Sequence, residues 1–144
     1  MNFVRRFLPG IFLLLLASRV SADIQAPQQV LEAFLDAYNA HDVDRVVELM
    51  DPSVRTMAVD GDSLSVWSTG IGELEQMLRE GFAAVPTTRS EIVESQVLGN
   101  YVAVTEKALW DVNGRTRSQC AMSVYKILDG RVHAIWYYPE QACE

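Results

Sequence analysis

The sequence has few of the residues that build metal sites and nucleic-acid interfaces. Its 144 residues include two histidines and two cysteines, and their spacing does not resemble a zinc site. Basic residues are also scarce, with 12 lysines and arginines against 19 acidic residues. Nucleic acids and anionic membranes are bound by clustered positive charge, so this composition argues against both partners. We expect no metal ion and no cofactor.

The chain also lacks an apolar run long enough to span a bilayer comfortably. Its longest candidate, residues 7–17, is too short, follows Arg5 and Arg6, and precedes the small residues of Val20-Ser21-Ala22. This pattern predicts a secretory signal peptide over residues 1–22, a single domain over residues 23–144, and a periplasmic or secreted protein. The alternative is an uncleaved membrane anchor. Cleavage would remove three basic residues and no acidic one, which lowers the net charge from −7 to −10.

The two cysteines lie late in the chain. An exported protein meets an oxidising compartment, so Cys120 and Cys143 can form a disulfide that ties the C-terminal tail to the preceding strands. The alternative is a pair of free thiols, and the sequence leaves both open.

Three segments have the apolar periodicity of amphipathic helices. The strongest is residues 30–38, followed by residues 43–50 and residues 71–82. Asp42 is a suitable N-cap for the second helix, and Asp51-Pro52 ends it. From residue 89 the apolar period changes to two, which is typical of strands.

The strands are expected at residues 54–59, 63–67, 90–98, 101–112, 115–128 and 132–139. Asn113-Gly114 and Asp129-Gly130 are strong signals for two-residue hairpin turns. The fold class is therefore α+β, with three N-terminal helices packed on a curved, mainly antiparallel sheet.

The break between the first two helices reads Asn-Ala-His-Asp-Val-Asp from Asn39, and the last hairpin reads Tyr-Lys-Ile-Leu-Asp-Gly-Arg-Val from Tyr125. With this order of elements, residues 27–139 resemble the nuclear transport factor 2-like superfamily, and within it the SnoaL-like and ketosteroid-isomerase-like branch. The resemblance implies a cone-shaped domain with an apolar pocket between the helices and the concave sheet face, and a homodimer. It does not define a reaction, because isomerases, cyclases, hydrolases and binding domains share this fold.

Side chains alternate across a strand, and the more apolar set of residues 101–112 contains Glu106, so we place Glu106 inward. A two-residue turn at Asp129-Gly130 would pair Met122 with Tyr137 and put both on one face. Strict pairing through Asn113-Gly114 would put Met122 and Glu106 on different faces of the sheet. Placing both inward needs a β-bulge. The ligand-binding residues expected on this basis, together with alignment to the ketosteroid isomerase pattern, are Phe34, Tyr38, Met57, Trp110, Met122, Ile135 and Tyr137.

Glu106 is the sharpest catalytic candidate, because a carboxyl among apolar neighbours suits general acid or base chemistry. His133 is the second, as a proton shuttle or as the partner of Glu106. The alternatives are a structural ion pair of Glu106 with Arg117 or Lys107, and a histidine at the rim. The ketosteroid isomerase catalytic positions fall at Ala58, Phe34 and Met122, so that mechanism is not expected.

Two functions follow from these expectations. The first is the binding of a small apolar ligand or a partner, and the alternative is a small cofactor-free lyase- or isomerase-like enzyme using Glu106. The opposite sheet face is expected to be apolar, which predicts a homodimer through that face or its covering by the C-terminal tail. Its expected residues are Tyr101, Leu109, Tyr125, Ile127, Trp136 and Tyr138.

Overall fold

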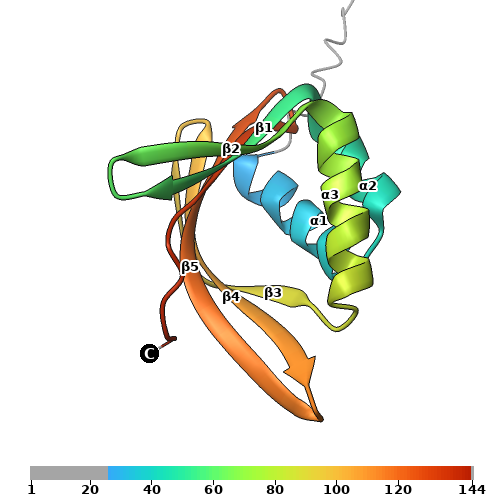
Figure 1. The fold of residues 1–144 in the computed structure, drawn as a ribbon. Coiled ribbons are helices and arrows are strands. Elements are labelled where there is room, and N and C mark those ends of the chain that lie inside the picture. Colours follow the sequence, from blue (N-terminus) through green and yellow to red (C-terminus); the bar gives the residue numbers. More distant parts are fainter. Residues whose placement is uncertain (1–25, 144) are drawn as a thin grey trace, which may run out of the picture.

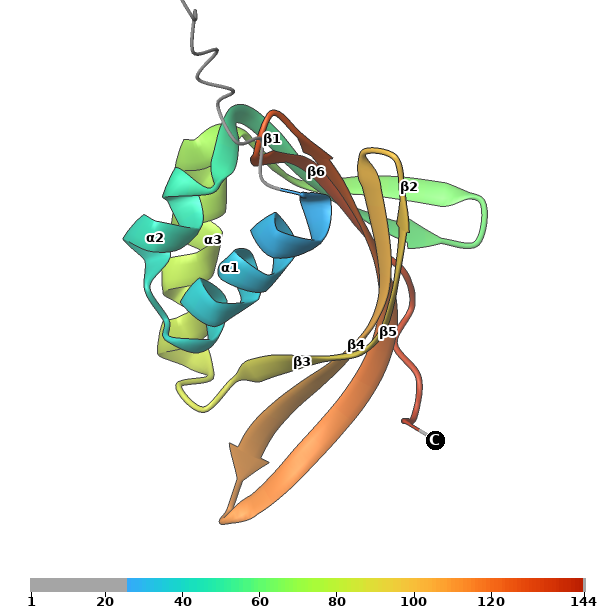
Figure 2. The ribbon, with the colours of Figure 1, turned by 180° about the vertical axis from the view of Figure 1, so that it is seen from behind.

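Three helices lie against the concave face of a curved, open sheet of six strands in the computed structural model, which describes residues 26–143 (Figures 1 and 2). The predicted signal peptide and its cleavage site lie outside these residues. No helix in the described range is long and apolar enough to cross a membrane. The elements in chain order are α1 (Pro27–Asn39), α2 (Val43–Glu48), β1 (Met50–Asp60), β2 (Ser63–Thr69), α3 (Gly70–Ala84), β3 (Arg89–Leu98), β4 (Tyr101–Val112), β5 (Arg115–Leu128) and β6 (Arg131–Tyr137).

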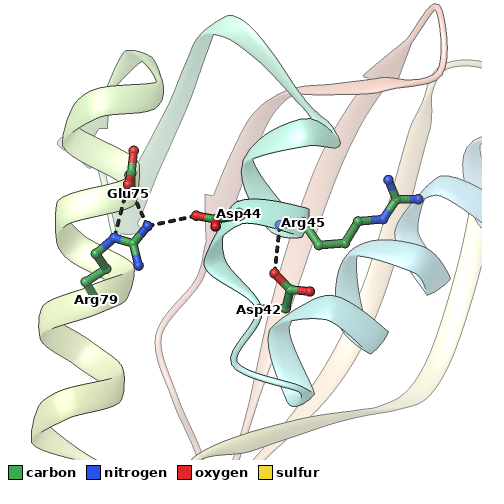
Figure 3. A network of polar contacts seen from close by, with 5 residues as sticks. All are labelled: Asp42, Asp44, Arg45, Glu75 and Arg79. Atoms are coloured by element: carbon green, nitrogen blue, oxygen red, sulfur yellow. Dashed lines mark hydrogen bonds and ion pairs between the residues drawn. The ribbon is translucent and has the colours of Figure 1, made fainter.

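The first helix forms where the apolar stripe predicts it. Val30 and Leu31 are fully buried and Phe34 is nearly so, which anchors α1 on the sheet. After Asn39 the backbone turns through His41, which adopts a left-handed φ of 55°. Asp42 then caps α2, because its Oδ1 accepts a hydrogen bond from the Arg45 backbone N–H at 3.0 Å (Figure 3).

A polar network on the surface joins α2 to α3. Arg79 donates to Asp44 at 2.8 Å and to Glu75 at 2.7 Å (Figure 3). Exposed ion pairs of this kind contribute little free energy. The larger contribution comes from Leu74 and Leu78, which are buried on the inner side of α3. The two leucines and the ion pairs of Arg79 together hold α3 in place above the sheet.

The sheet order is β2-β1-β6-β5-β4-β3. Strands β3 to β6 form the predicted antiparallel meander, and both hairpin turns have the expected positive φ values, 52° and 72° at Asn113 and Gly114, and 51° and 74° at Asp129 and Gly130. β1 lies parallel to β6, a pairing that the sequence pattern did not indicate.

The β4–β5 ladder runs without a bulge from its turn. Glu106 pairs with Ala121, and Thr105 pairs with Met122. Paired residues point to the same side of a sheet and neighbours along a strand point to different sides, so Met122 lies on the sheet face away from Glu106. The predicted bulge between these strands is absent, and the inward placement of Met122 is wrong.

The bulge occurs in the next ladder instead. Ile127 pairs with Val132 and Lys126 pairs with Ala134, which leaves His133 as the extra residue on β6. Beyond the bulge, Tyr125 pairs with Ile135 and Ser123 pairs with Tyr137. The concave face of β5 is therefore formed by Ser123 and Tyr125.

The opposite sheet face is formed by a different set of residues than predicted. Tyr125 and Ile127, expected there, are buried in the core beneath the helices. Tyr101 lies on that face as predicted, about 44% exposed, and Met122, predicted inward, also lies there, about 43% exposed. The homodimer through this face stays a prediction.

The C-terminal tail runs along β5 where β6 ends. The Tyr138 backbone N–H donates to the Met122 carbonyl, and Gln141 exchanges backbone hydrogen bonds with Cys120. A disulfide joins Cys120 to Cys143. The tail therefore extends the sheet by main-chain pairing and is held there covalently.

Candidate functional site

A cavity of about 410 Å³ lies between α1, α3 and the concave face of the sheet. The helices supply its apolar wall because the stripes that anchor them also face this space. The wall residues from the helices are Phe34, Leu35, Tyr38, Met77, Leu78, Gly81 and Phe82. The sheet and the segments beside it supply Trp67, Thr88, Arg89, Ser90, Glu106, Ala108, Gln119, Ala121, Ser123, Tyr125, Tyr137, Tyr138 and Glu140, and Val85 follows α3.

The polar centre of this pocket is the carboxylate of Glu106. Its Oε1 accepts a hydrogen bond from the Tyr125 hydroxyl at 2.5 Å, and its Oε2 accepts one from the Ser90 hydroxyl at 3.0 Å. Tyr125 is fully buried. The carboxylate is thus fixed from both sides by neutral donors.

The end of α1 holds Ser90 in position. The Asn39 Nδ2 donates to the Ser90 carbonyl at 2.8 Å, and the Ser90 backbone N–H donates to the Asn39 Oδ1 at 2.7 Å. This paired contact joins the first helix to the start of β3. It orients the hydroxyl that contacts Glu106.

Three phenols near Glu106 are held in the neutral form. Burial and the negative charge of Glu106 raise the pKa of Tyr125 well above its usual value. The same two causes raise the pKa of Tyr137, whose phenol is buried although the residue is partly exposed as a whole. Burial is also the main cause that raises the pKa of Tyr38. All three are hydrogen-bond donors at neutral pH.

Four of the predicted site residues line the pocket: Glu106, Phe34, Tyr38 and Tyr137. Among residues 26–143, Glu106 has no ion pair with Arg117 or Lys107.

Met122 and Trp110, predicted as ligand-binding residues, do not line the pocket. Met122 lies on the opposite sheet face because of the strict β4–β5 register. Trp110 shares the face of Glu106, but it lies toward the end of the β4–β5 hairpin, which projects beyond the helices (Figures 1 and 2).

Met57 and Ile135 are buried but are also absent from the pocket wall. Met57 pairs with Trp136 in the parallel ladder, so it points to the opposite face. Ile135 belongs to the packed core. Ile135 therefore lies on the predicted inner face, but it packs in the core, where no cavity remains. The predicted inward placement of Met57 is wrong.

His133 does not meet Glu106. The bulge directs it to β1, where its Nε2 lies 3.7 Å from the Asp51 Oδ2. Hydrogen bonds from Ser53, and to a smaller extent the charge of His133, lower the pKa of Asp51. The prediction of His133 as a partner of Glu106 is wrong, and the pair with Asp51 joins β6 to β1.

Three residues that line the pocket were not predicted as site residues: Tyr125, Ser90 and Trp67. Strict pairing from the Asn113-Gly114 turn would have placed Tyr125 on the face of Glu106. Trp67 is the extra residue at a register shift between β1 and β2, and its ring stacks on Tyr137 with centroids 5.3 Å apart. No sequence signal marks that shift.

The fold and the pocket together define a nuclear transport factor 2-like domain. Within this superfamily the chain belongs to the SnoaL-like domain family, whose family model matches residues 31–135. No curated protein sequence matches the chain. Within the described residues, no three histidine, cysteine or acidic side chains gather as metal ligands.

Solved structures share the fold at low sequence identity. An uncharacterised cystatin-fold protein from Novosphingobium aromaticivorans is 23% identical, with a TM-score of 0.69 over 78% of this chain and 97% of its own. An NTF2-like protein of unknown function from Burkholderia pseudomallei is 20% identical, with a TM-score of 0.64 over 77% and 88%. An LEH-like epoxide hydrolase from Mycobacterium tuberculosis is 20% identical, with a TM-score of 0.62 over 78% and 80%. These similarities establish the fold alone.

Proposed function

We propose that this protein binds a small, mostly apolar molecule in the pocket between α1, α3 and the sheet. The observation that carries the proposal is that the pocket remains open. Its volume of about 410 Å³ is in the range of small-molecule sites, roughly 300–1,000 Å³. Its wall is mainly apolar and aromatic, and two of its polar groups, the hydroxyls of Tyr125 and Ser90, meet at Glu106. Such sites bind the body of a ligand by apolar contact and orient it by a few polar groups.

Two glycines of α3 provide a matched test. Gly81 lines the pocket and Gly72 does not, and a Cβ at either position would meet no atom within 4 Å. Leucine at both positions favours the helix more than glycine does, so both variants should fold. Gly81→Leu should weaken binding at least about tenfold by occupying the pocket mouth, and Gly72→Leu should leave affinity unchanged.

The measurement is the change in tryptophan fluorescence on titration with 4-phenylbutan-1-ol. Trp67 lines the pocket and stacks on Tyr137, so its emission should respond to an occupant. A titration in which Gly81→Leu binds as well as the unmodified protein would place the ligand elsewhere and contradict the proposal.

A catalytic role is the second candidate, and the placement of Glu106 favours it. The carboxyl lies in the pocket wall, and Tyr125 and Ser90 hold it in one orientation. General acid or base catalysis needs such a group within hydrogen-bond reach of a bound substrate. A cofactor-free lyase- or isomerase-like reaction would be lost in Glu106→Gln while ligand binding persists. Equal turnover by both proteins would exclude it.

We also propose that the protein is exported. The signal-like pattern of residues 1–22 supports this, and the disulfide between Cys120 and Cys143 suits an oxidising compartment. Mass spectrometry of protein from the periplasm or the medium should find an N-terminus at Asp23. Intact protein beginning at Met1 and confined to the cytoplasm would contradict export.

A further inference from the structure

Glu106 is a pocket carboxylate that has no cationic partner within residues 26–143. The ion pairs among residues 26–143 involve Glu48, Asp44, Glu75 and Asp51, and none of them involves Glu106. An ionised carboxylate has about four acceptor positions, and two hydroxyl donors occupy one on each oxygen. Charges taken from water are normally paired. The site therefore has acceptor capacity and negative charge that no side chain of the described residues matches.

The wall around this carboxylate is rich in aromatic rings. Three ring pairs enclose the pocket: Phe34 with Tyr125 at 5.6 Å between centroids, Tyr38 with Phe82 at 5.1 Å, and Trp67 with Tyr137 at 5.3 Å. The faces of such rings attract cations. Aromatic rings beside an unpaired carboxylate are the combination that binds an ammonium group.

We infer that the ligand of this pocket carries an ammonium group that lies against the Glu106 carboxylate, with its apolar body against α1 and α3. This inference rests on the proposed binding function and names the chemical class of the ligand. A protonated amine would donate to the free acceptor positions of Glu106 and contact the surrounding ring faces. An anionic ligand would be repelled by Glu106, and its one basic contact among the lining residues of the described chain would be Arg89.

Three probes of one shape test the charge preference. They are 4-phenylbutylamine, 4-phenylbutan-1-ol and 4-phenylbutanoate, titrated into the purified, disulfide-bonded protein by calorimetry near pH 7.5. The amine should bind at least about tenfold more tightly than the alcohol, and the carboxylate should bind most weakly. This comparison needs no variant, so it does not depend on how any substitution folds.

Two variants then test whether the charge of Glu106 causes the preference for the amine. Glu106→Gln keeps the shape of the side chain and removes its charge, so the amine should lose its advantage while the alcohol binds as before. Glu94→Gln removes the same charge from an exposed residue that pairs with Thr105, away from the pocket. It should keep the full preference for the amine.

The outcomes separate the inference from the function on which it rests. If the alcohol or the carboxylate binds as tightly as the amine, the ammonium inference is wrong and the binding function stands. If Glu106→Gln retains the amine preference, the inference is also wrong. If none of the three probes binds, the proposed function and the inference both fail.

Discussion

Replacing Tyr125 with phenylalanine tests the polar centre of the pocket most sharply. The substitution keeps the ring, which packs on Phe34 with centroids 5.6 Å apart, and removes the hydroxyl that lies 2.5 Å from the Glu106 Oε1. Hydrogen bonds to charged groups contribute roughly 1.5–3 kcal/mol to stability. Tyr125 is fully buried, but Glu106 faces the open pocket, where water can reach the freed carboxylate oxygen, so the loss should lie in the lower half of this range. We expect a loss of about 2 kcal/mol in the free energy of unfolding, measured with urea.

A double-mutant cycle assigns that loss to the contact itself. Glu106→Leu removes the acceptor at similar volume, and the double variant should be less destabilised than the sum of the single changes by about 1–2 kcal/mol. Tyr101→Phe, on the opposite face and about 44% exposed, is the control and should change stability little. A coupling below about 0.5 kcal/mol would refute the hydrogen bond as a stabilising contact.

Two further predictions concern pH and the disulfide. The raised pKa values of Tyr38, Tyr125 and Tyr137 mean that, above pH 10, the unfolded state releases protons that the folded state keeps. The free energy of unfolding should therefore be fully present below pH 10 and should fall by up to about 4 kcal/mol per pH unit above it. Tyrosinate absorbance should then rise together with unfolding. Full ionisation of all tyrosines in the folded protein would contradict this. Reducing the Cys120–Cys143 bond, which closes a loop with a sequence separation of 23, should lower stability by about 3 kcal/mol, with a Cys120→Ser/Cys143→Ser variant that shows no response to reductant as the control.

The helices and strands could be predicted because local chemistry determines them. The apolar stripe containing Val30 and Leu31 determines which face of the first helix is buried. Asp42 determines where the second helix begins, because its side chain caps that helix. Turn residues at Asn113-Gly114 and Asp129-Gly130 also adopt the predicted backbone. These features depend on neighbours along the chain.

The pocket residues were predicted less well because they depend on register. A single extra residue, His133, changes which residues of β6 pair with β5. Pairing from the Asp129-Gly130 turn, together with alignment to the ketosteroid isomerase pattern, placed Met122 inward in place of Tyr125 and required a bulge between β4 and β5. The turn at Asn113-Gly114 indicated the correct β4–β5 register, whereas strict pairing from Asp129-Gly130 joined Met122 to Tyr137, which the bulge at His133 shifts to Ser123.

The parallel pairing of β1 with β6 is a contact between distant segments that no local pattern encodes. It brings β2 to the sheet edge and Trp67 to Tyr137. Side chains that meet through such pairings could be found from the three-dimensional arrangement alone.

The location of the ligand can be measured directly with methionine methyl groups as reporters. Met77 lines the pocket, and Met122 lies exposed on the opposite sheet face. In protein labelled with ¹³C at the methionine methyl groups, titration with 4-phenylbutylamine should shift the Met77 signal and leave the Met122 signal in place. A shift at Met122 without one at Met77 would contradict the assignment of the pocket as the binding site.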